Sequence, residues 1–316
     1  MLKYIVQRLL ALFPVVILVT IIVFTVANLI PGDPAVVALG HSATPENVKI
    51  FRHKWGLDKP FIARYFIWLA NVAHGDLGSS YISRKSVASI IAEALPVTLQ
   101  LIFYALIIAL IVAVPTAILA AVRQNSWIDL IATSGSLVGL AIPNFWLGIM
   151  LMILLAVQFR LFPASGYVSP FVDFPDHLRH MILPSITLAA WMIVPLIRFL
   201  RSELIRVLKK GYIYTARMKG LSEAVVIGKH AMRNGLIPFV TQLGMTVGEQ
   251  IGGTIVLEQV FAIPGMGRTA IAAIFAREYQ VVMGVVLVLT IGFLVINLLV
   301  DFLYMVLDPR IRLTGE

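Results

Sequence analysis

The side chains of this sequence that could act as catalysts or metal ligands are a few histidines and carboxylates. His177 and His180 have the spacing of two ligands on one helical turn, but there is no cysteine and one histidine pair is a weak metal signal. The H-E-x-x-H and G-x-S-x-G patterns of hydrolases are absent, and so is the G-x-x-x-x-G-K-[ST] phosphate loop. We therefore expect no catalytic residue, no metal site, no cofactor bound by this chain and no enzymatic activity.

Two carboxylates are notable because they lie inside long apolar runs. A charge at membrane depth is costly unless it faces the interior of a helix bundle, a partner or water. Glu249 could line a pathway, where it would meet a cationic group of a solute, or it could form a buried hydrogen bond or ion pair. Asp301 lies about one turn beyond Asn297, which favours a structural role in hydrogen bonds between helices.

The elements that must position these residues are long apolar helices. The 316 residues are 59% hydrophobic and 13% charged, and their mean hydropathy of +0.93 is too high for a water-soluble domain. Backbone in lipid must satisfy its own hydrogen bonds, and a crossing helix needs about 20 residues. We therefore expect an all-α membrane protein with six transmembrane helices. The runs are roughly Leu9 to Ile30, Val97 to Val122, Leu130 to Val157, Ile182 to Leu200, Leu236 to Val256 and Val281 to Leu307.

The orientation follows from the distribution of Lys and Arg. The net charge is +9, and most Lys and Arg residues lie in segments that would be cytoplasmic if the amino terminus is cytoplasmic. This distribution agrees with the positive-inside rule. We therefore expect both termini in the cytoplasm, membrane lipid as a partner and no nucleic acid. The first apolar run is too long for a secretory signal and lacks a small-residue cleavage site, so it should remain attached.

The chain should divide into four parts. Residues 1–30 form an amino-terminal transmembrane helix, 31–96 an extracytoplasmic cap, 97–307 a five-helix core with a cytoplasmic loop at 201–235, and 308–316 a cytoplasmic tail. The cap carries aromatic residues at helical spacing from Phe61 to Leu69, a stripe that favours packing within its own domain over ligand binding.

Small and helix-breaking residues mark places where helices meet or bend. Gly244, Gly248 and Gly252 recur every four residues and Gly253 follows, so a neighbouring backbone can approach, either within this subunit or in a second one. Pro143 and Pro195 should break or bend the third and fourth spans. Asn144, beside the first of these prolines, joins Glu249 as a candidate for a translocation path.

The loop between the fourth and fifth spans is the most basic stretch of the chain. From Arg198 to Arg233 it holds nine Lys or Arg and only two acids, Glu203 and Glu223. The charges alone are explained by topology and by attraction to anionic lipid heads. The pattern of small residues in the same loop has no use in lipid binding, and it favours a surface that receives a protein partner.

This loop resembles the EAA loop of ABC importer permeases of the oligopeptide, dipeptide and nickel family. The stretch is Tyr212-Ile-Tyr-Thr-Ala-Arg-Met-Lys-Gly-Leu-Ser-Glu223, followed by Lys229-His-Ala-Met-Arg-Asn-Gly-Leu-Ile-Pro238. Four further segments agree with the same family, so the resemblance spans nearly the whole chain. They are Leu29-Ile-Pro-Gly-Asp-Pro34, His74-Gly-Asp-Leu-Gly78, Phe261-Ala-Ile-Pro-Gly-Met-Gly-Arg268, and Asn297 to Tyr304 with Leu307 to Arg312.

The loop also departs from the general pattern of that family. With Gly220 aligned to the glycine of the motif, Tyr214 and Thr215 replace its glutamate and first alanine, and only Ala216 is retained. The interval from Gly220 to Pro238 is longer than in sugar-type permeases, a feature of the peptide and nickel branch.

The resemblance implies a type I ABC importer permease fold in the bacterial inner membrane. It implies a homologous sister permease, two ATP-binding subunits that hold ATP and Mg, and an extracytoplasmic solute-binding protein. Peptide is the default solute, and nickel chelates, glutathione or opines are alternatives. A stand-alone secondary transporter is the alternative from a different class, although we find no internal repeat of the kind such transporters show.

The resemblance also assigns roles to the loop residues. It implies that the loop is a coupling element that docks on an ATPase, formed by Tyr214, Thr215, Ala216, Arg217, Lys219, Gly220, Leu221, Ser222 and Glu223. We expect Thr215, Ala216 and Gly220 to provide a close fit, and Arg217 and Lys219 to steer docking through acids on the partner. Gly220 could alternatively serve only as a helix cap.

Overall fold

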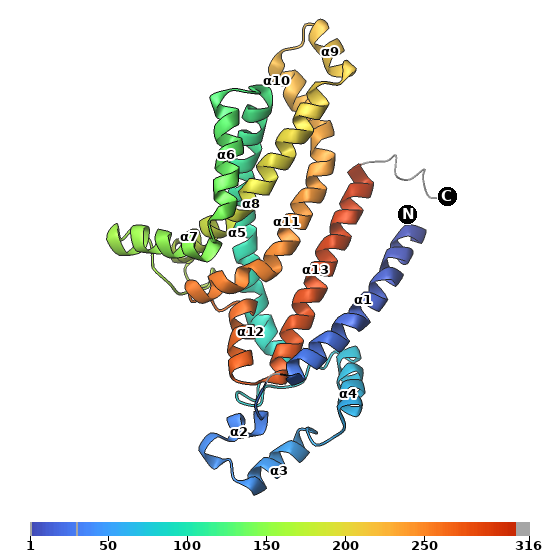
Figure 1. Cartoon of the computed structure of the whole chain (residues 1–316), viewed down its shortest axis with the longest axis vertical. Helices are drawn as coiled ribbons and strands as arrows, with labels where there is room; N and C mark the ends of the chain where they lie inside the picture. The colour runs from blue at the N-terminus through green and yellow to red at the C-terminus, as the bar shows by residue number, and fades with distance from the viewer. Residues whose placement is uncertain (1, 30, 308–316) are drawn as a thin grey trace. The chain divides into compact units, whose positions relative to one another are not determined.

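The computed structural model describes residues 2–29 and 31–307, which are mostly helical and contain no strand (Figure 1). The α-helices are α1 (Leu2–Leu29), α2 (Pro34–Leu39), α3 (Pro45–Lys54), α4 (Phe61–Ala73), α5 (Val87–Val122), α6 (Trp127–Ala141), α7 (Asn144–Leu151), α8 (Phe174–Leu208), α9 (Gly211–Met218), α10 (Glu223–Val225), α11 (Met232–Val260), α12 (Met266–Phe275) and α13 (Tyr279–Leu307). A 3-10 turn, η1 (Gly40–Ser42), and two π-helices, η2 (Met152–Gln158) and η3 (Val226–Ala231), complete the set.

The described residues form two compact units. The first joins the chain up to Thr98 with Pro264–Leu294, and the second joins Leu99–Ile263 with the described residues from Val295 on. The predicted boundaries at residues 30 and 96 stay predictions, and the predicted tail at 308–316 lies outside the described residues, as does most of the motif from Leu307 to Arg312.

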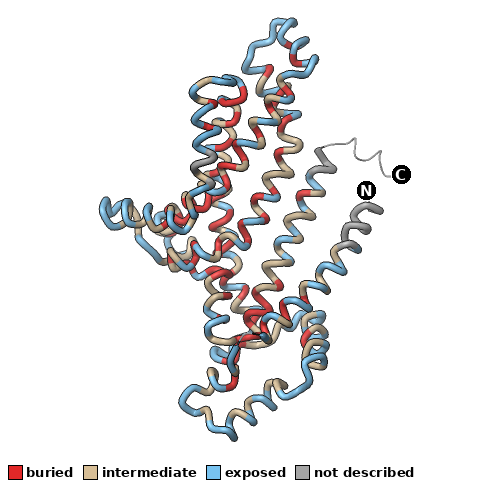
Figure 2. The backbone as a smooth tube through the Cα atoms, viewed as in Figure 1, coloured by how far each residue is buried: buried red, intermediate tan, exposed pale blue. Residues whose placement is uncertain are grey.

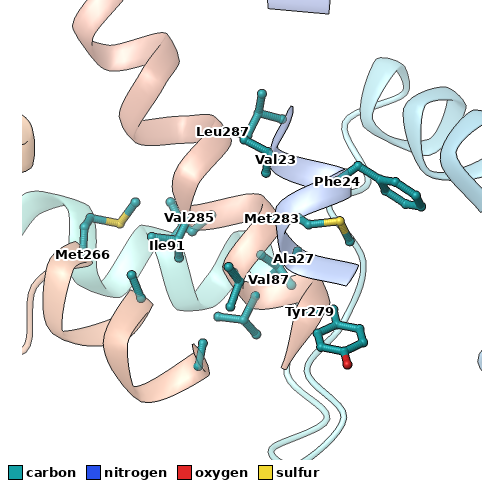
Figure 3. Close-up of a cluster of buried hydrophobic side chains, with 14 of the residues drawn as sticks. Val23, Phe24, Ala27, Val87, Ile91, Met266, Tyr279, Met283, Val285 and Leu287 are labelled. Carbon is teal, nitrogen blue, oxygen red and sulfur yellow. The ribbon is translucent and has the colours of Figure 1, made fainter. Parts of the chain in front are cut away.

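The core of the first unit is an apolar cluster drawn from α1, α4, α5, α12 and α13. Figure 3 shows Phe24 of α1, Val87 of α5 and Met283 of α13 within this cluster. A Cβ atom at Gly284 would overlap Cγ1 of Val87, so α13 and α5 approach there too closely for a side chain. The predicted aromatic stripe of the cap lies on α4 and is divided, because Trp68 is buried while Phe66 is exposed.

The cap is fastened to the turn between α12 and α13 by polar contacts. The buried carboxylate of Glu278 accepts hydrogen bonds of 2.7 Å from both the Ser80 hydroxyl and the Ile82 backbone N–H. The Tyr279 hydroxyl donates to the carbonyl of Gly32 at 3.0 Å. The loop that contains Ser80 and the segment that contains Gly32 therefore both contact the turn between α12 and α13.

The second unit is organised around α8, against which α6, α7 and α11 all pack. Arg201 of α8 forms a bidentate ion pair with Asp129 of α6, with Nη2 2.7 Å from Oδ2. The sequence predicted that Pro195 would break or bend the fourth span. It does not break the helix, since α8 continues through Pro184 and Pro195, and the bend stays a prediction. Neighbouring helices pack closely around this stretch and keep it helical despite the lost backbone hydrogen bonds.

The third predicted span, Leu130 to Val157, is not one helix. It consists of α6, α7 and η2, with Ile142 extended and Pro143 at the cap of α7. The residue before a proline disfavours the helical conformation, so α6 ends just before Pro143, where the sequence predicted a break or a bend. Figure 1 shows α7 running across the direction of α6.

Within the described ranges, four helices are long and apolar enough to cross a membrane. They are α1 (from Leu12), α5, α8 and α13 (to Leu303). At 29 residues α11 also has the length to cross, but it carries Arg233, Glu249 and Glu258. The count of six crossings and the cytoplasmic location of both termini stay predictions.

Candidate functional site

The predicted coupling loop is a short helical hairpin at one end of the second unit, beyond the ends of α8 and α11 (Figure 1). The chain leaves α8 at Lys209 and enters α9 after Lys210, whose carbonyl accepts from the Ile213 N–H at 3.0 Å. After α9, the turn at Gly220 leads into α10, and η3 then joins α10 to α11. All nine residues of the predicted loop therefore lie in one compact substructure.

The turn that ends α9 is a Schellman motif. Gly220 has φ of +74°, its N–H donates to the carbonyl of Arg217 at 2.9 Å, and the Leu221 N–H donates to the carbonyl of Ala216 at 3.4 Å. A left-handed conformation at this position favours glycine, so the capping role of Gly220 is confirmed. A Cβ atom here would meet nothing within 4 Å, so within this chain the glycine is required by its backbone angle and not by crowding.

The two faces of α9 differ in exposure. Ile213 and Ala216 are buried, and α9 packs against η3 on this side. Tyr214 is 66% exposed and Met218, one turn further, is 72% exposed, while Leu221 beside them is 39% exposed. Figure 2 shows the outer surface of this loop as mainly exposed. Large apolar side chains gathered at a loop tip are typical of an interaction surface.

The charged residues of the loop are partly engaged with each other. Arg217 contacts Glu223 through two hydrogen bonds, Nε to Oε1 at 2.7 Å and Nη2 to Oε2 at 3.2 Å. This hydrogen bonding lowers the pKa of the Glu223 carboxyl from its usual 4.5. Lys219 makes no ion pair with any described residue. The Arg217–Glu223 pair joins residues on the two sides of the Gly220 turn and so stabilises the turn.

The short helix α10 begins after Ser222, whose backbone carbonyl accepts from the N–H groups of Val225 and Val226 at 3.0 Å each. Thr215 is exposed, and its hydroxyl donates back to the carbonyl of Gly211 at 3.1 Å. The Thr215 side chain is thus occupied by its own helix and presents mainly its methyl group outward.

The glycines of α11 serve different purposes. A Cβ atom at Gly244 would overlap Cγ2 of Val300 in α13, so this glycine permits close packing within the subunit. Gly248 is buried, and a Cβ atom at Gly253 would lie 2.9 Å from Oε1 of Gln250 on the same helix. Gly252 is exposed with open space around it. Gly244 therefore allows a close contact between two helices of this chain, whereas no described residue packs against the Cβ position of Gly252.

Glu249 lies on an exposed face of α11. Met245, Glu249, Gly252 and Val256 are all exposed and follow helical spacing, so they share one side of the helix. A carboxylate on the outer face of a helix within an apolar region requires a partner or water. Asn144 is the half-buried first residue of α7, and no described hydrogen bond joins it to Glu249.

The opposite side of α11 carries a ladder of polar residues that our sequence reasoning missed. Its members are spaced four residues apart, and the last four are buried: Gln242, Thr246, Gln250, Thr254 and Glu258. Thr246 donates to the carbonyl of Gln242 at 2.9 Å. Gln250 likewise donates to the carbonyl of Thr246 at 3.4 Å, so these hydrogen bonds lie within α11 itself. The regular spacing was the signal available in the sequence.

His177 has a structural role in the second unit. It is fully buried, its Nδ1 lies 2.7 Å from the Val168 carbonyl, and its Nε2 lies 3.1 Å from the Tyr104 hydroxyl. Both ring nitrogens thus have protein partners. Among the described residues there is no group of three or more side chains suited to hold a metal ion.

Comparison with known proteins assigns the chain to a family. Residues 113–313 match the family described as "Binding-protein-dependent transport system inner membrane component", and residues 1–102 match the family describing the N-terminal part of such membrane components. The chain belongs to this family. It is an ABC importer permease and a multi-pass protein of the inner membrane, as the resemblance implied.

Named relatives of this permease align over nearly their full length. A putative peptide transport system permease protein of Brucella abortus (strain 2308) is 43% identical over 98% of both chains. The glutathione transport system permease protein GsiC of Escherichia coli O6:H1 is 37% identical over 99% of both chains. The oligopeptide transport system permease protein AppB of Bacillus subtilis (strain 168) is 37% identical over 99% of this permease and 100% of AppB.

Proposed function

We propose that this permease forms the membrane path of an ATP-driven importer of peptides. The observation that carries the proposal is the similarity, over nearly the whole chain, to permeases named for peptide and oligopeptide transport. GsiC is named for glutathione, which is itself a modified tripeptide, so the relatives share a peptide-like solute. Nickel chelates and opines remain alternative solutes that the binding protein of the system would select.

The energy for import comes from separate ATP-binding subunits that hold ATP and Mg, since this chain lacks a phosphate-binding loop. We infer that these subunits dock on the α9–α10 hairpin. Its exposed Tyr214, Met218 and Leu221 offer apolar contact, and Lys219 offers a free charge for steering. Arg217 already pairs with Glu223, so it can bind an acid of the partner only if it contacts both carboxylates or if its pair with Glu223 opens.

The exposed side of α11 is the proposed contact with a homologous sister permease or with the solute path. Gly252 gives a neighbouring helix room to approach, and Glu249 gives it a carboxylate to pair with. The proposed architecture has six crossings, α11 and the α6–α7 region among them, with both termini cytoplasmic.

The function is tested by isolating the complete importer through a tag on this chain. We expect a sister permease and two ATP-binding subunits to co-purify, and proteoliposomes with the binding protein to take up radiolabelled trialanine only when ATP and Mg are supplied. Uptake that continues after ATP depletion, without any retained ATPase, would support a secondary transporter instead.

The topology can be tested directly because the chain contains no cysteine. Single-cysteine variants Lys49→Cys in the cap and Lys219→Cys in the hairpin would be treated with a membrane-impermeant maleimide. We expect Lys49→Cys to react from the extracytoplasmic side and Lys219→Cys only in inverted vesicles. The reverse pattern would refute the proposed orientation.

A further inference from the structure

The first unit contains a cavity of about 270 Å³ that the proposed function does not use. It lies among α1, α4, α13 and the turn after α3, and all its lining residues belong to this one unit. The volume equals that of about nine liquid water molecules, which suits a solute of one or two amino-acid residues and is too small for a longer peptide.

Five residues of the cavity lining are aromatic: Phe24, Trp55, Trp68, Tyr81 and Tyr279. Trp55 and Tyr81 meet edge to face with ring centroids 4.8 Å apart, and Phe24 and Trp68 lie with centroids 5.7 Å apart. Burial raises the pKa of Tyr81 to about 12, so its hydroxyl is even less acidic than that of an ordinary tyrosine. Such walls favour an apolar or aromatic group in the ligand.

The lining carries more positive than negative charge. Lys54, Lys59 and Arg64 contribute to it, against the single carboxylate of Asp76, one oxygen of which already accepts from the Gly78 N–H at 2.8 Å. Arg64 is held by a hydrogen bond to Asn28, while both lysines are exposed and make no ion pair with a described residue. The excess of cations favours an anionic group in the ligand.

We propose that this cavity binds a small amphipathic carboxylate, of the class of a dipeptide with an apolar side chain. The side chain lies against the aromatic residues of the lining, and the carboxylate faces the lysines. The lining residues are not among the candidates for a translocation path, and binding at this site can be measured without transport.

The test uses the full-length chain in lipid nanodiscs, without binding protein, and the probe L-alanyl-L-phenylalanine. Saturation-transfer NMR reports contact of the phenyl protons, and titration gives Kd. The same dipeptide as its C-terminal amide serves as the matched ligand, and empty nanodiscs correct for partition into lipid. We expect the amide to bind about five- to tenfold more weakly than the acid, the effect of one charge-assisted hydrogen bond.

Two variants locate the site. Lys54→Gln and Lys59→Gln each remove one cation from the lining. Each should weaken binding of the acid about three- to tenfold. Lys49→Gln, an exposed lysine of the same cap that does not line the cavity, should leave Kd unchanged.

The proposal is overturned if the probe shows no transfer beyond empty nanodiscs, or if acid and amide bind equally. It is also overturned if Lys59→Gln, whose exposed side chain is not required for folding, leaves Kd unchanged. Signals that arise only when the binding protein is added would assign the cavity to protein docking and would equally refute it.

Discussion

Cγ2 of Val300 in α13 occupies the place that a Cβ atom of Gly244 in α11 would take. Gly252, two turns further along α11, has open space around it. The two glycines therefore differ in their surroundings. Gly244 allows close packing of α11 against α13, whereas Gly252 lies on an exposed face of α11.

The first prediction is that Gly244→Ala destabilises the chain by about 1–3 kcal/mol, because the new methyl group overpacks against Val300. Gly252→Ala is the matched control: it gains the same helix propensity without the overlap, so it should keep or raise the thermal unfolding temperature of the isolated chain in detergent. The pairing with Val300 is tested by Gly244→Ala with Val300→Ala, which should restore part of the lost stability. Equal loss in both single glycine variants would contradict this account.

The second prediction concerns Gly220. Gly220→Val should strain the left-handed turn by about 1–2 kcal/mol and reduce the ATPase retained on the tagged permease. Gly220→Asn is tolerated in that backbone conformation, so the hairpin should persist. Full ATPase retention by the Asn variant would show that docking needs only the turn, while loss of retention would show that the partner also requires the absence of a side chain. Full retention and coupling in Gly220→Glu would refute docking at this turn.

The third prediction is a pH effect on the Arg217–Glu223 pair. Because the folded pKa of Glu223 is lowered from 4.5, the pair's contribution is fully present above pH 4.5 and is lost as the pH falls through the lowered pKa. Carboxyl NMR of ¹³C-labelled Glu223 should show this lowered midpoint, and Arg217→Gln should return it toward 4.5. A midpoint that Arg217→Gln does not move would exclude the contact in solution.

The fourth prediction concerns Glu249. If its carboxylate serves the solute path or the sister permease, Glu249→Gln should reduce peptide uptake roughly tenfold, while the isolated chain keeps its unfolding temperature because the side chain is exposed. Retention of the sister permease on the tagged chain separates the two roles. Unchanged uptake and unchanged assembly would leave Glu249 without either role.

The fifth prediction concerns the cap. Ser80→Ala removes a hydrogen bond to the buried Glu278 carboxylate and should cost about 1.5–3 kcal/mol, the range for bonds to charged groups. Ser83→Ala, in the same loop, does not touch Glu278 and is the control. Hydrogen exchange at the Ile82 amide, which donates to the same carboxylate, should rise in the Ser80 variant alone.

The sequence was sufficient to predict the long helices and the break before Asn144. Apolar runs and a proline act locally, so α5, α8 and α13 and the end of α6 could be predicted without knowing what packs against them. The Gly220 turn was predictable for the same reason, since a left-handed helix end is a local preference for glycine.

What the sequence did not reveal depends on contacts between distant segments. Gly244 and Gly252 are identical in type and spacing, and only the position of Val300 distinguishes them. Whether Pro195 would break its helix or only bend it could not be decided from the sequence, and α8 continues through it without a break. The pairing of Arg217 with Glu223 spans a turn whose geometry had to be known before the two charges could be placed together.

The alternation of buried and exposed residues on α9 has a consequence for exchanging partners between transport systems. Ile213 and Ala216 are part of the interior of this chain, so their size is set by η3 and not by any ATPase. Tyr214, Met218 and Leu221 are free of that constraint. If the ATPase docks on this hairpin as proposed, a permease engineered to accept a foreign ATPase should be altered at these three positions, with Ile213 and Ala216 kept unchanged.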